Sequence, residues 1–253
     1  MATPMSCASW ATPRTGRNRP ASDLETSAAR SEAHVQSAIG LSLSASRDGG
    51  ALTVDVTLQN QAGHKFPTGY PTRRAWLHLV VRDGSQVVFE SGAEDPATGS
   101  LVDASGLGST IRRPSWPHRD RIDAPDQVQI YESRLVDAEG APTHLALGAD
   151  HYAKDNRLLP SGWSTSHPRQ CHPSGGVDDD DDFVAGRDVV HYRVAGACGG
   201  PGGGGDVSLP IGPSRNHRQP AGRAHLAAVR FVDMATARAP ESITVASVQA
   251  TVP

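Results

Sequence analysis

The chain contains little cysteine, and the cysteines that it has are scattered. Its 253 residues include Cys7, Cys171 and Cys198. Three cysteines at such wide spacing make neither a disulfide framework nor a Cys-rich zinc site. A single pair, such as Cys171 with Cys198, would leave one thiol over. The cysteine count therefore does not indicate a cellular compartment.

Long apolar runs are also missing. No run approaches the ~20 residues that a transmembrane helix needs. The first 34 residues contain Arg14, Arg17 and Arg19, but no apolar segment follows, as it would in a secretory signal. We therefore expect either a cytoplasmic protein or a chain that lacks its true N-terminus. The net charge of −3 argues against a nucleic acid or an anionic membrane as partner.

Lysine is rare, whereas glycine and proline are abundant. Lys65 and Lys154 are the two lysines, and glycine plus proline (26 + 19) make up 45 of the 253 residues. Hydrophobic residues reach 37%, below the usual globular share. This composition favours many short strands and turns over long helices.

Alternating apolar and polar residues predict most of the strands. ALTVDVTLQN places four apolar side chains on one face, namely Leu52, Val54, Val56 and Leu58. With IGLSLSAS and the intervening Asp-Gly-Gly turn it predicts a hairpin. Residues 74–83 and 86–91 predict a second hairpin around Gly84-Ser85. Residues 127–137 and 188–194 predict further strands, and weaker signals lie at 143–147, 207–211, 225–232 and 242–248.

These patterns predict an all-β chain folded as an antiparallel β-sandwich with long irregular loops. Residues 1–34 lack periodicity, so we expect them to be largely disordered, with at most a weak helix around Leu24 to His34. Residues 35–253 form the sandwich domain. Within it, residues 195–206 are a Gly-rich linker, and residues 207–253 supply the closing strands.

The stretch GHKFPTGYPTRRAW, residues 63–76, combines rigid and polar residues in one connection between strands. Pro67 and Pro71 fix the backbone locally, and Gly63 and Gly69 permit left-handed turns. His64 is thus presented on a stiff loop, which suits a ligand or a hydrogen-bond hub. A rigid crossover loop in a sandwich would need the same residues without any functional role.

The same stretch carries a family resemblance. GHKFPTGYPTRRAWLHLVVRD followed by VVFESGAEDPATG resembles the haem-free C-terminal β-domain of bacterial multihaem c-type cytochromes of the cytochrome c-554 type. Three further blocks follow in the same order, at residues 117–133, 151–163 and 181–194. The resemblance covers roughly residues 38–195, and both lysines fall inside it. The last ~55 residues fit the family poorly, which a frame error near the Gly-rich segment would explain.

The resemblance implies a periplasmic or extracytoplasmic protein of electron transfer. In such cytochromes an upstream segment binds several haems c through Cys-x-x-Cys-His. A second histidine often supplies the remaining axial ligand of the haem iron. His64 is the first candidate for this distal ligand, and His118 is the second. The implied partners are the haem-binding segment of the cytochrome or a redox partner protein.

The chain departs from the family in one respect, because it contains no Cys-x-x-Cys-His. In MSCASWA, Trp10 and Ala11 follow Cys7 where the second cysteine and the histidine would stand. RQCHP has Cys171-His172, but Pro168 stands where a first cysteine would. We therefore expect no covalently bound haem on this chain. Both near-matches are explained by chance, and a degenerate or truncated cytochrome end is the alternative for the first one.

Nine residues of the shared blocks form a predicted structural motif. In HYAKDNRLLPSGW, Asp155, Asn156 and Arg157 are suited to close a turn, and Leu158 and Leu159 to anchor it in the core. Arg157 also suits a carboxylate partner. A functional site is the alternative role. The full motif comprises Lys65, Pro67, Gly69, Arg73, Arg74, Lys154, Asp155, Asn156 and Arg157.

Other motifs give weak signals. The DDDDDF run at residues 178–183 predicts a solvated acidic loop rather than a calcium site, because calcium loops space their ligands and adjacent side chains of an extended run diverge. His167, Cys171 and His172 are weak zinc candidates. No nucleophile elbow, Walker loop or His-Glu-x-x-His helix occurs.

We therefore predict a non-catalytic domain that packs on a haem-binding segment. One alternative is a stand-alone carbohydrate- or protein-binding module, in which Trp76, Trp116 and Trp163 would be exposed for stacking. Another is a metal-dependent hydrolase, which needs a His/Asp cluster that the sequence spacing does not show. Grouping of His64, His118 and His151 on one surface would favour haem or metal contact.

Overall fold

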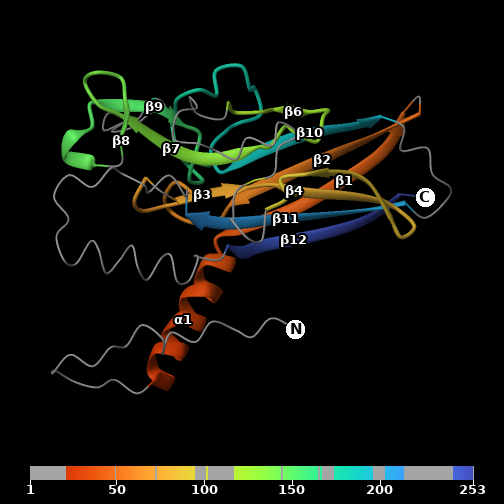
Figure 1. Ribbon diagram of the computed structural model, residues 1–253, viewed down its shortest axis with the longest axis horizontal. Coiled ribbons are helices and arrows are strands. Elements are labelled where there is room, and N and C mark those ends of the chain that lie inside the picture. Colours follow the sequence, from red (N-terminus) through yellow and green to blue (C-terminus); the bar gives the residue numbers. More distant parts are fainter. Residues whose placement is uncertain are drawn as a thin grey trace.

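The computed structural model describes residues 21–48, 50–71, 73–94, 101, 117–143, 145–164, 166, 174–195, 203–213 and 242–252. Figure 1 shows layered strands from which an α-helix, α1 (Ala21–Gln36), projects. No helix in these ranges has the length and apolar character that crossing a membrane requires. The helix is longer than the weak one predicted around Leu24 to His34, and it covers part of the segment predicted to be disordered.

The first sheet has four strands in the order β1-β2-β10-β6. Their bounds are β1 Ile39–Asp48, β2 Ala51–Asn60, β6 Arg121–Ile122 and β10 Arg187–Ala195. The β1–β2 hairpin is antiparallel and places Ile39 opposite Asn60. β10 pairs with β2 antiparallel and with β6 parallel. The strict alternation of β2 decides its orientation, because Val54, Val56 and Leu58 are buried.

The second sheet has the order β5-β4-β11-β3-β7-β8, with β12 paired to β11 and β9 paired to β7. The strands are β3 Arg73–Trp76, β4 His78–Asp83, β5 Gln86–Ser91, β7 Ile130–Val136, β8 Pro142–Thr143, β9 His151–Asp155, β11 Gly203–Pro213 and β12 Ile243–Val252. A short 3-10 helix, η2 (Ala146–Gly148), precedes β9. Apart from β11 and β12, the strands of this sheet lie within residues 38–195, the range that carries the four shared sequence blocks.

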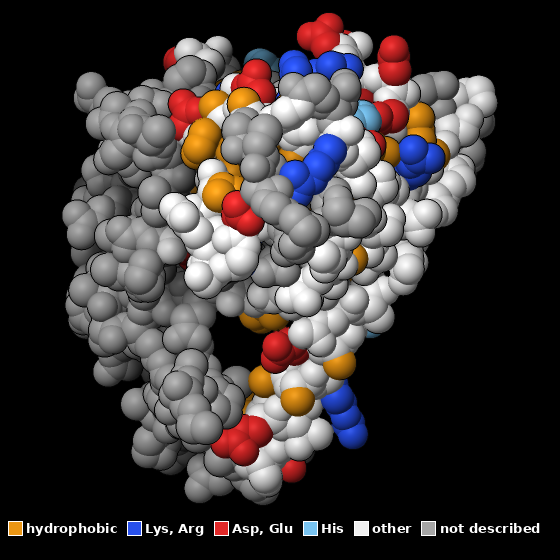
Figure 2. Space-filling view, turned by 90° about the vertical axis from the view of Figure 1, so that its right-hand side faces the viewer, with side chains coloured by type: hydrophobic (Ala, Val, Ile, Leu, Met, Phe, Trp, Pro, Cys, Tyr) orange, Lys and Arg blue, Asp and Glu red, His pale blue; other side chains and the backbone are white. Residues whose placement is uncertain are grey.

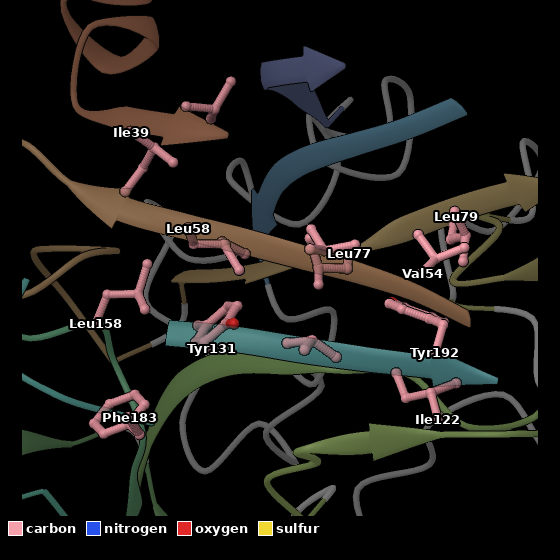
Figure 3. Packing of buried hydrophobic residues seen from close by; sticks show 14 of the residues in the cluster. Ile39, Val54, Leu58, Leu77, Leu79, Ile122, Tyr131, Leu158, Phe183 and Tyr192 are labelled. Atoms are coloured by element: carbon pink, nitrogen blue, oxygen red, sulfur yellow. The ribbon is translucent and has the colours of Figure 1, made fainter. Parts of the chain in front are cut away.

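The hydrophobic core lies between the two sheets. Leu58 and Tyr192 come from the first sheet, and Leu77, Leu79 and Tyr131 come from the segments of the second. Figure 3 shows these side chains gathered between the strands, with Leu158 and Phe183 at one end. Burying such side chains stabilises the fold by about 1.5–3 kcal/mol each. The predicted antiparallel β-sandwich is confirmed.

Two strand predictions differ from the structure. Residues 74–83 form two strands, β3 and β4, with Leu77 between them, although β11 pairs with both strands in one continuous register. The predicted Gly-rich linker is wrong at residues 203–206, which belong to β11 and pair with β4 and β12. Ladder hydrogen bonds use only the backbone, so neighbouring strands on both sides hold a segment without side chains. The strand predicted at residues 225–232 lies outside the described residues.

Gly92 follows β5 at a crowded turn. Its φ is +82°, and a Cβ built there would overlap the carbonyl oxygen of Leu77. Its own carbonyl accepts a hydrogen bond of 3.0 Å from the indole Nε1 of the buried Trp76. Gly84 also has a positive φ, of +57°, but its Cβ would meet nothing within 4 Å. The two glycines therefore form a matched pair that separates backbone strain from steric overlap.

We expect Gly84→Ala to lower the free energy of unfolding by roughly 1–2 kcal/mol, the cost of a left-handed alanine. Gly92→Ala should cost at least ~3 kcal/mol, since overpacking adds to the same strain. Urea denaturation followed by circular dichroism measures both changes. Equal losses in the two variants would contradict the close approach of Gly92 to Leu77.

Candidate functional site

The loop that carries His64 is held against the segment after β9. The buried side-chain amide of Asn60 donates to the carbonyls of His64 at 2.8 Å and of Leu158 at 3.1 Å. The backbones of Phe66 and Leu158 exchange two hydrogen bonds, of 2.9 and 2.8 Å. Leu158 is fully buried and Leu159 nearly so. These contacts join two parts of the chain that are about 95 residues apart and fix the backbone at His64.

A buried carboxylate completes this connection. Asp155 is 1% exposed and accepts hydrogen bonds from Lys65 Nζ at 2.8 Å and from Arg157 Nε and Nη2 at 2.7 and 2.8 Å. Burial raises the pKa of Asp155, but the hydrogen bonds and charges of Arg157 and Lys65 outweigh it, so the pKa lies below its usual value. The carboxylate thus stays charged and bound to two cations.

His64 itself points outward from this fixed loop. Its side chain is exposed, and its Nδ1 lies 3.1 Å from the carbonyl oxygen of Lys65. A carbonyl only accepts hydrogen bonds, so this contact places the ring proton on Nδ1. The lone pair of the neutral ring is then on Nε2. This tautomer is the one that coordinates a metal through Nε2.

A cavity of about 350 Å³ lies beside His64. It is bounded by the last residues of α1 and by the loop after β2, and its lining includes His34, Val35, His64, Phe66 and Arg73. The cavity thus combines two imidazoles, apolar side chains and one guanidinium. Apolar walls with few polar groups are typical of ligand sites.

The remaining residues of the loop have structural contacts. Pro67 is buried and follows Phe66 through a cis peptide bond. Gly69 has a φ of +94°, and the guanidinium of Arg73 covers it. The same group donates to the carbonyl of Thr68 at 3.2 Å. Arg74 is buried, with its guanidinium 5.2 Å from the ring centroid of Trp76.

Lys154 and Asn156 lie under β7. The ammonium of Lys154 is 2% exposed, donates to the carbonyl of Ile130 at 3.0 Å and lies 3.5 Å from Glu132 Oε1. Burial lowers its pKa to about 8. Asn156 Oδ1 accepts from the N–H of Glu132 at 2.9 Å, and its Nδ2 donates to the carbonyl of Ile130 at 2.8 Å. Both side chains therefore stabilise the pairing of β7 with its neighbours.

His118 occupies a different environment from His64. Its side chain is 4% exposed, and its Nε2 lies 2.6 Å from Asp180 Oδ2. Its Nδ1 lies 2.8 Å from Gln129 Nε2 and 3.0 Å from Asn156 Nδ2. Both amide groups are oriented by backbone N–H groups that bind their oxygens, so Nδ1 accepts and Nε2 donates. Burial lowers the pKa of His118 despite Asp180.

The acidic run is divided between solvent and interior. Asp178, Asp179 and Asp181 are exposed, but Asp180 is 9% exposed and Asp182 is half-buried. Asp180 Oδ1 accepts hydrogen bonds of 3.0 Å from the N–H groups of Asp182 and Phe183. The predicted solvated acidic loop is therefore confirmed for the three exposed residues and wrong for Asp180 and Asp182. Phe183 is anchored in the core, and this anchor turns two of the carboxylates inward.

Asp188 is a buried carboxylate close to this run. Its side chain is fully buried, and Oδ2 accepts a hydrogen bond of 2.5 Å from the Tyr131 hydroxyl, while Oδ1 has no partner among the described residues. Burial raises the pKa of Asp188 to about 7, and the charges of Asp180 and Asp182 add to this effect. Asp188, His118 and Asp180 bring possible metal-ligand atoms within 4.8 Å of one another.

A second group of this kind lies at the surface of the first sheet. It consists of Asp120, Asp182 and His191, whose ligand atoms also lie within 4.8 Å of one another. Sequence reasoning missed it, because these residues are far apart along the chain. The parallel pairing of β10 with β6 brings Asp120 next to His191, whose N–H donates to the Asp120 carbonyl at 2.8 Å. A histidine within a strand that follows an acidic run was the available signal.

Several residues singled out from the sequence belong to neither of these two metal-ligand groups. Within the described residues, neither metal-ligand group includes His64 or His151. Trp76 is 1% exposed and packs in a buried cluster, so it does not offer the stacking surface that the binding-module alternative requires, and Trp163 is half-buried. Trp116, the three cysteines, His167 and His172 lie outside the described residues.

Stability should depend on Asp188 in a pH-dependent manner. Because its folded pKa is raised, the folded protein holds a proton that the unfolded chain loses near pH 4, and the associated stability is lost as the pH rises through about 7. Asp188→Asn keeps an acceptor for Tyr131 without a charge. We expect its stability relative to the wild type to be greater at pH 8 than at pH 5, measured by urea denaturation. A difference that does not change with pH would contradict the raised pKa.

Comparisons with known proteins give one match. No family model matches the chain, and no curated protein is similar to it. A solved structure, a penta-heme cytochrome c552 from Thermochromatium tepidum, is similar at 16% identity with a TM-score of 0.49. The match covers 87% of this chain and 41% of that cytochrome, so the chain spans less than half of its length. The chain is thus weakly similar to part of a multihaem cytochrome.

Proposed function

We propose that this chain is a non-catalytic β-sandwich domain of, or derived from, a multihaem c-type cytochrome. In this role it packs on a haem-binding segment, in a periplasmic or extracytoplasmic setting, and supports electron transfer between that segment and a redox partner protein. The four ordered sequence blocks support the proposal, and the sandwich is the fold that they imply. The haem itself would belong to the partner segment.

The observation that carries the proposal is the geometry of His64. The loop is fixed by Asn60 and Asp155, the imidazole is exposed, and its Nδ1 proton is bound to a carbonyl. Its Nε2 is therefore available to a sixth coordination position of an iron outside this chain. His118 was the second candidate, but both of its ring nitrogens already have partners in a buried network. We assign the distal role to His64.

The cavity beside His64 is consistent with this role. Its apolar residues, such as Val35 and Phe66, suit the edge of a porphyrin, and Arg73 suits an anionic propionate. The cavity is much smaller than a whole haem needs. The remainder of the porphyrin would therefore be covered by the segment that binds it covalently.

We expect His64→Ala to abolish iron coordination by the chain. The probe is a haem c peptide that carries one histidine ligand and has a vacant sixth position. Added wild-type chain should convert its absorption spectrum from high spin to low spin. The matched control is His151→Ala, because His151 is an exposed imidazole that contacts Asp150; it should behave as the wild type. The same conversion with His64→Ala, or none with the wild type, would contradict the ligand role.

The parent protein provides a second test. The protein purified from its native host should show a Soret band and an intact mass well above the 26.6 kDa of this chain. A protein of 26.6 kDa without a Soret band would contradict the cytochrome assignment. It would leave the binding-module alternative, which then requires an exposed aromatic platform elsewhere.

A further inference from the structure

His191 lies among three carboxylates on the outer face of the first sheet. The β2–β10 register places Asp55 directly opposite it, and Nδ1 lies 2.6 Å from Asp55 Oδ1. Nε2 lies 3.2 Å from Asp182 Oδ2 and 3.7 Å from Asp120 Oδ1. All four side chains are 30–40% exposed. The group is therefore accessible from solvent.

This arrangement requires a positive charge at Nε2. The short contact with Asp55 places the Nδ1 proton between the ring and that carboxylate, so a neutral ring would direct its Nε2 lone pair at two further anions. Either a second proton or a bound cation removes the repulsion. Burial lowers the pKa of His191, but the hydrogen bonds to Asp55 and Asp182 outweigh it and raise the pKa overall.

The spacing of the three ligand atoms fits a tetrahedral ion. Bonds of about 2.1 Å from Zn²⁺ to nitrogen and oxygen place tetrahedral ligand atoms about 3.4 Å apart, and the two distances at Nε2 are 3.2 and 3.7 Å. Asp55 on Nδ1 supplies the carboxylate–histidine contact that orients metal-binding imidazoles. A cavity of about 380 Å³, lined by Arg121 and Asp123, borders His191, and the partial exposure of Asp120 and Asp182 gives water access as a fourth ligand.

Carboxyl groups crowd this part of β10 on both faces of the strand. Asp188 precedes His191 on the same strand, is fully buried, and has an Oδ1 without a partner among the described residues. Its carboxyl group interacts electrostatically with Asp182, which belongs to the surface group, and with Asp180. A cation held by Asp182 would reduce this electrostatic repulsion between carboxyl groups.

The inner group with His118 does not offer the same site. Its Nδ1 accepts from two oriented amide groups, so its Nε2 carries the proton that Asp180 accepts. No lone pair of the ring is then free for an ion. His191 differs, because its Nδ1 contacts a carboxylate and its Nε2 faces two partly exposed carboxylates, Asp120 and Asp182.

We infer that Asp120, Asp182 and His191 bind a divalent transition-metal ion of the Zn²⁺ type, with Asp55 as the positioning residue for the imidazole. The ion links β6, β10 and the acidic loop, which are distant in sequence. This inference is independent of the haem-related function proposed above. Figure 2 shows acidic and basic side chains interspersed on the face that it draws.

Calorimetric titration of the chelator-treated full chain with ZnCl₂ tests the site. We expect one equivalent to bind tightly, and Asp120→Asn to weaken this binding without disturbing the fold, because the side-chain ion pairs of Asp120 with described residues are long, at 3.5 and 3.7 Å. Asp55→Asn should weaken it by about 10–100-fold. His191→Gln should remove it. The matched control is Asp181→Asn in the same acidic run, since Asp181 is exposed; it should bind as the wild type.

A second control separates this site from the His167, Cys171 and His172 segment, which is the other zinc candidate in the sequence. The double variant Cys171→Ser/His172→Ala should keep the tight equivalent. Loss of binding in that variant, equal binding by wild type and His191→Gln, or no tight binding by the wild type would each overturn the inference. Circular dichroism of every variant verifies folding, and Asp120→Asn retains the test if another variant fails to fold.

Discussion

A buried carboxylate must remain bound to cations, or its burial destabilises the protein by several kcal/mol. Asp155 meets this condition by holding Lys65 and Arg157 at once. These ion pairs join the loop after β2 to the segment after β9. The two segments are the two halves of the predicted structural motif. The position of His64 depends on this pairing, since Lys65 is its neighbour in sequence. Lys65 is one of the two lysines in the sequence, and it forms this buried ion pair.

Strand β10 organises the polar chemistry on the other side of the sandwich. It pairs with β2 on one edge and with β6 on the other, and its residues alternate between the interior and solvent. Asp188 faces the buried hydroxyl of Tyr131, whereas His191 faces Asp55 and Asp182. One strand thus borders two groups of ionisable side chains with different exposure. Burial favours the neutral forms of Asp188 and His118 in the inner group, whereas the carboxylates around His191 favour its charged form.

Much of the fold could be predicted from periodicity, because period-two patterns such as that of β2 determine which face is buried. The interruption of the next strand at Leu77 could not, since nothing in the apolar pattern of residues 74–83 marks it. The candidate site also has parts that the sequence predicts and parts that it does not. The rigidity around His64 is local and visible in its prolines and glycines. The surroundings of His118 and His191 are built from distant segments, and spacing along the chain carries no trace of them.

The topology of the second sheet has a consequence for the order of folding. β11 comes late in the chain, yet it pairs with β4, β3 and β12. During synthesis, β3 and β4 therefore expose unpaired edges until residues 203–213 have left the ribosome. Such edges are templates for association with other chains, and non-local pairings of this kind close slowly. The nascent protein thus depends on a late, glycine-containing strand to complete a sheet whose first strands were made more than a hundred residues earlier.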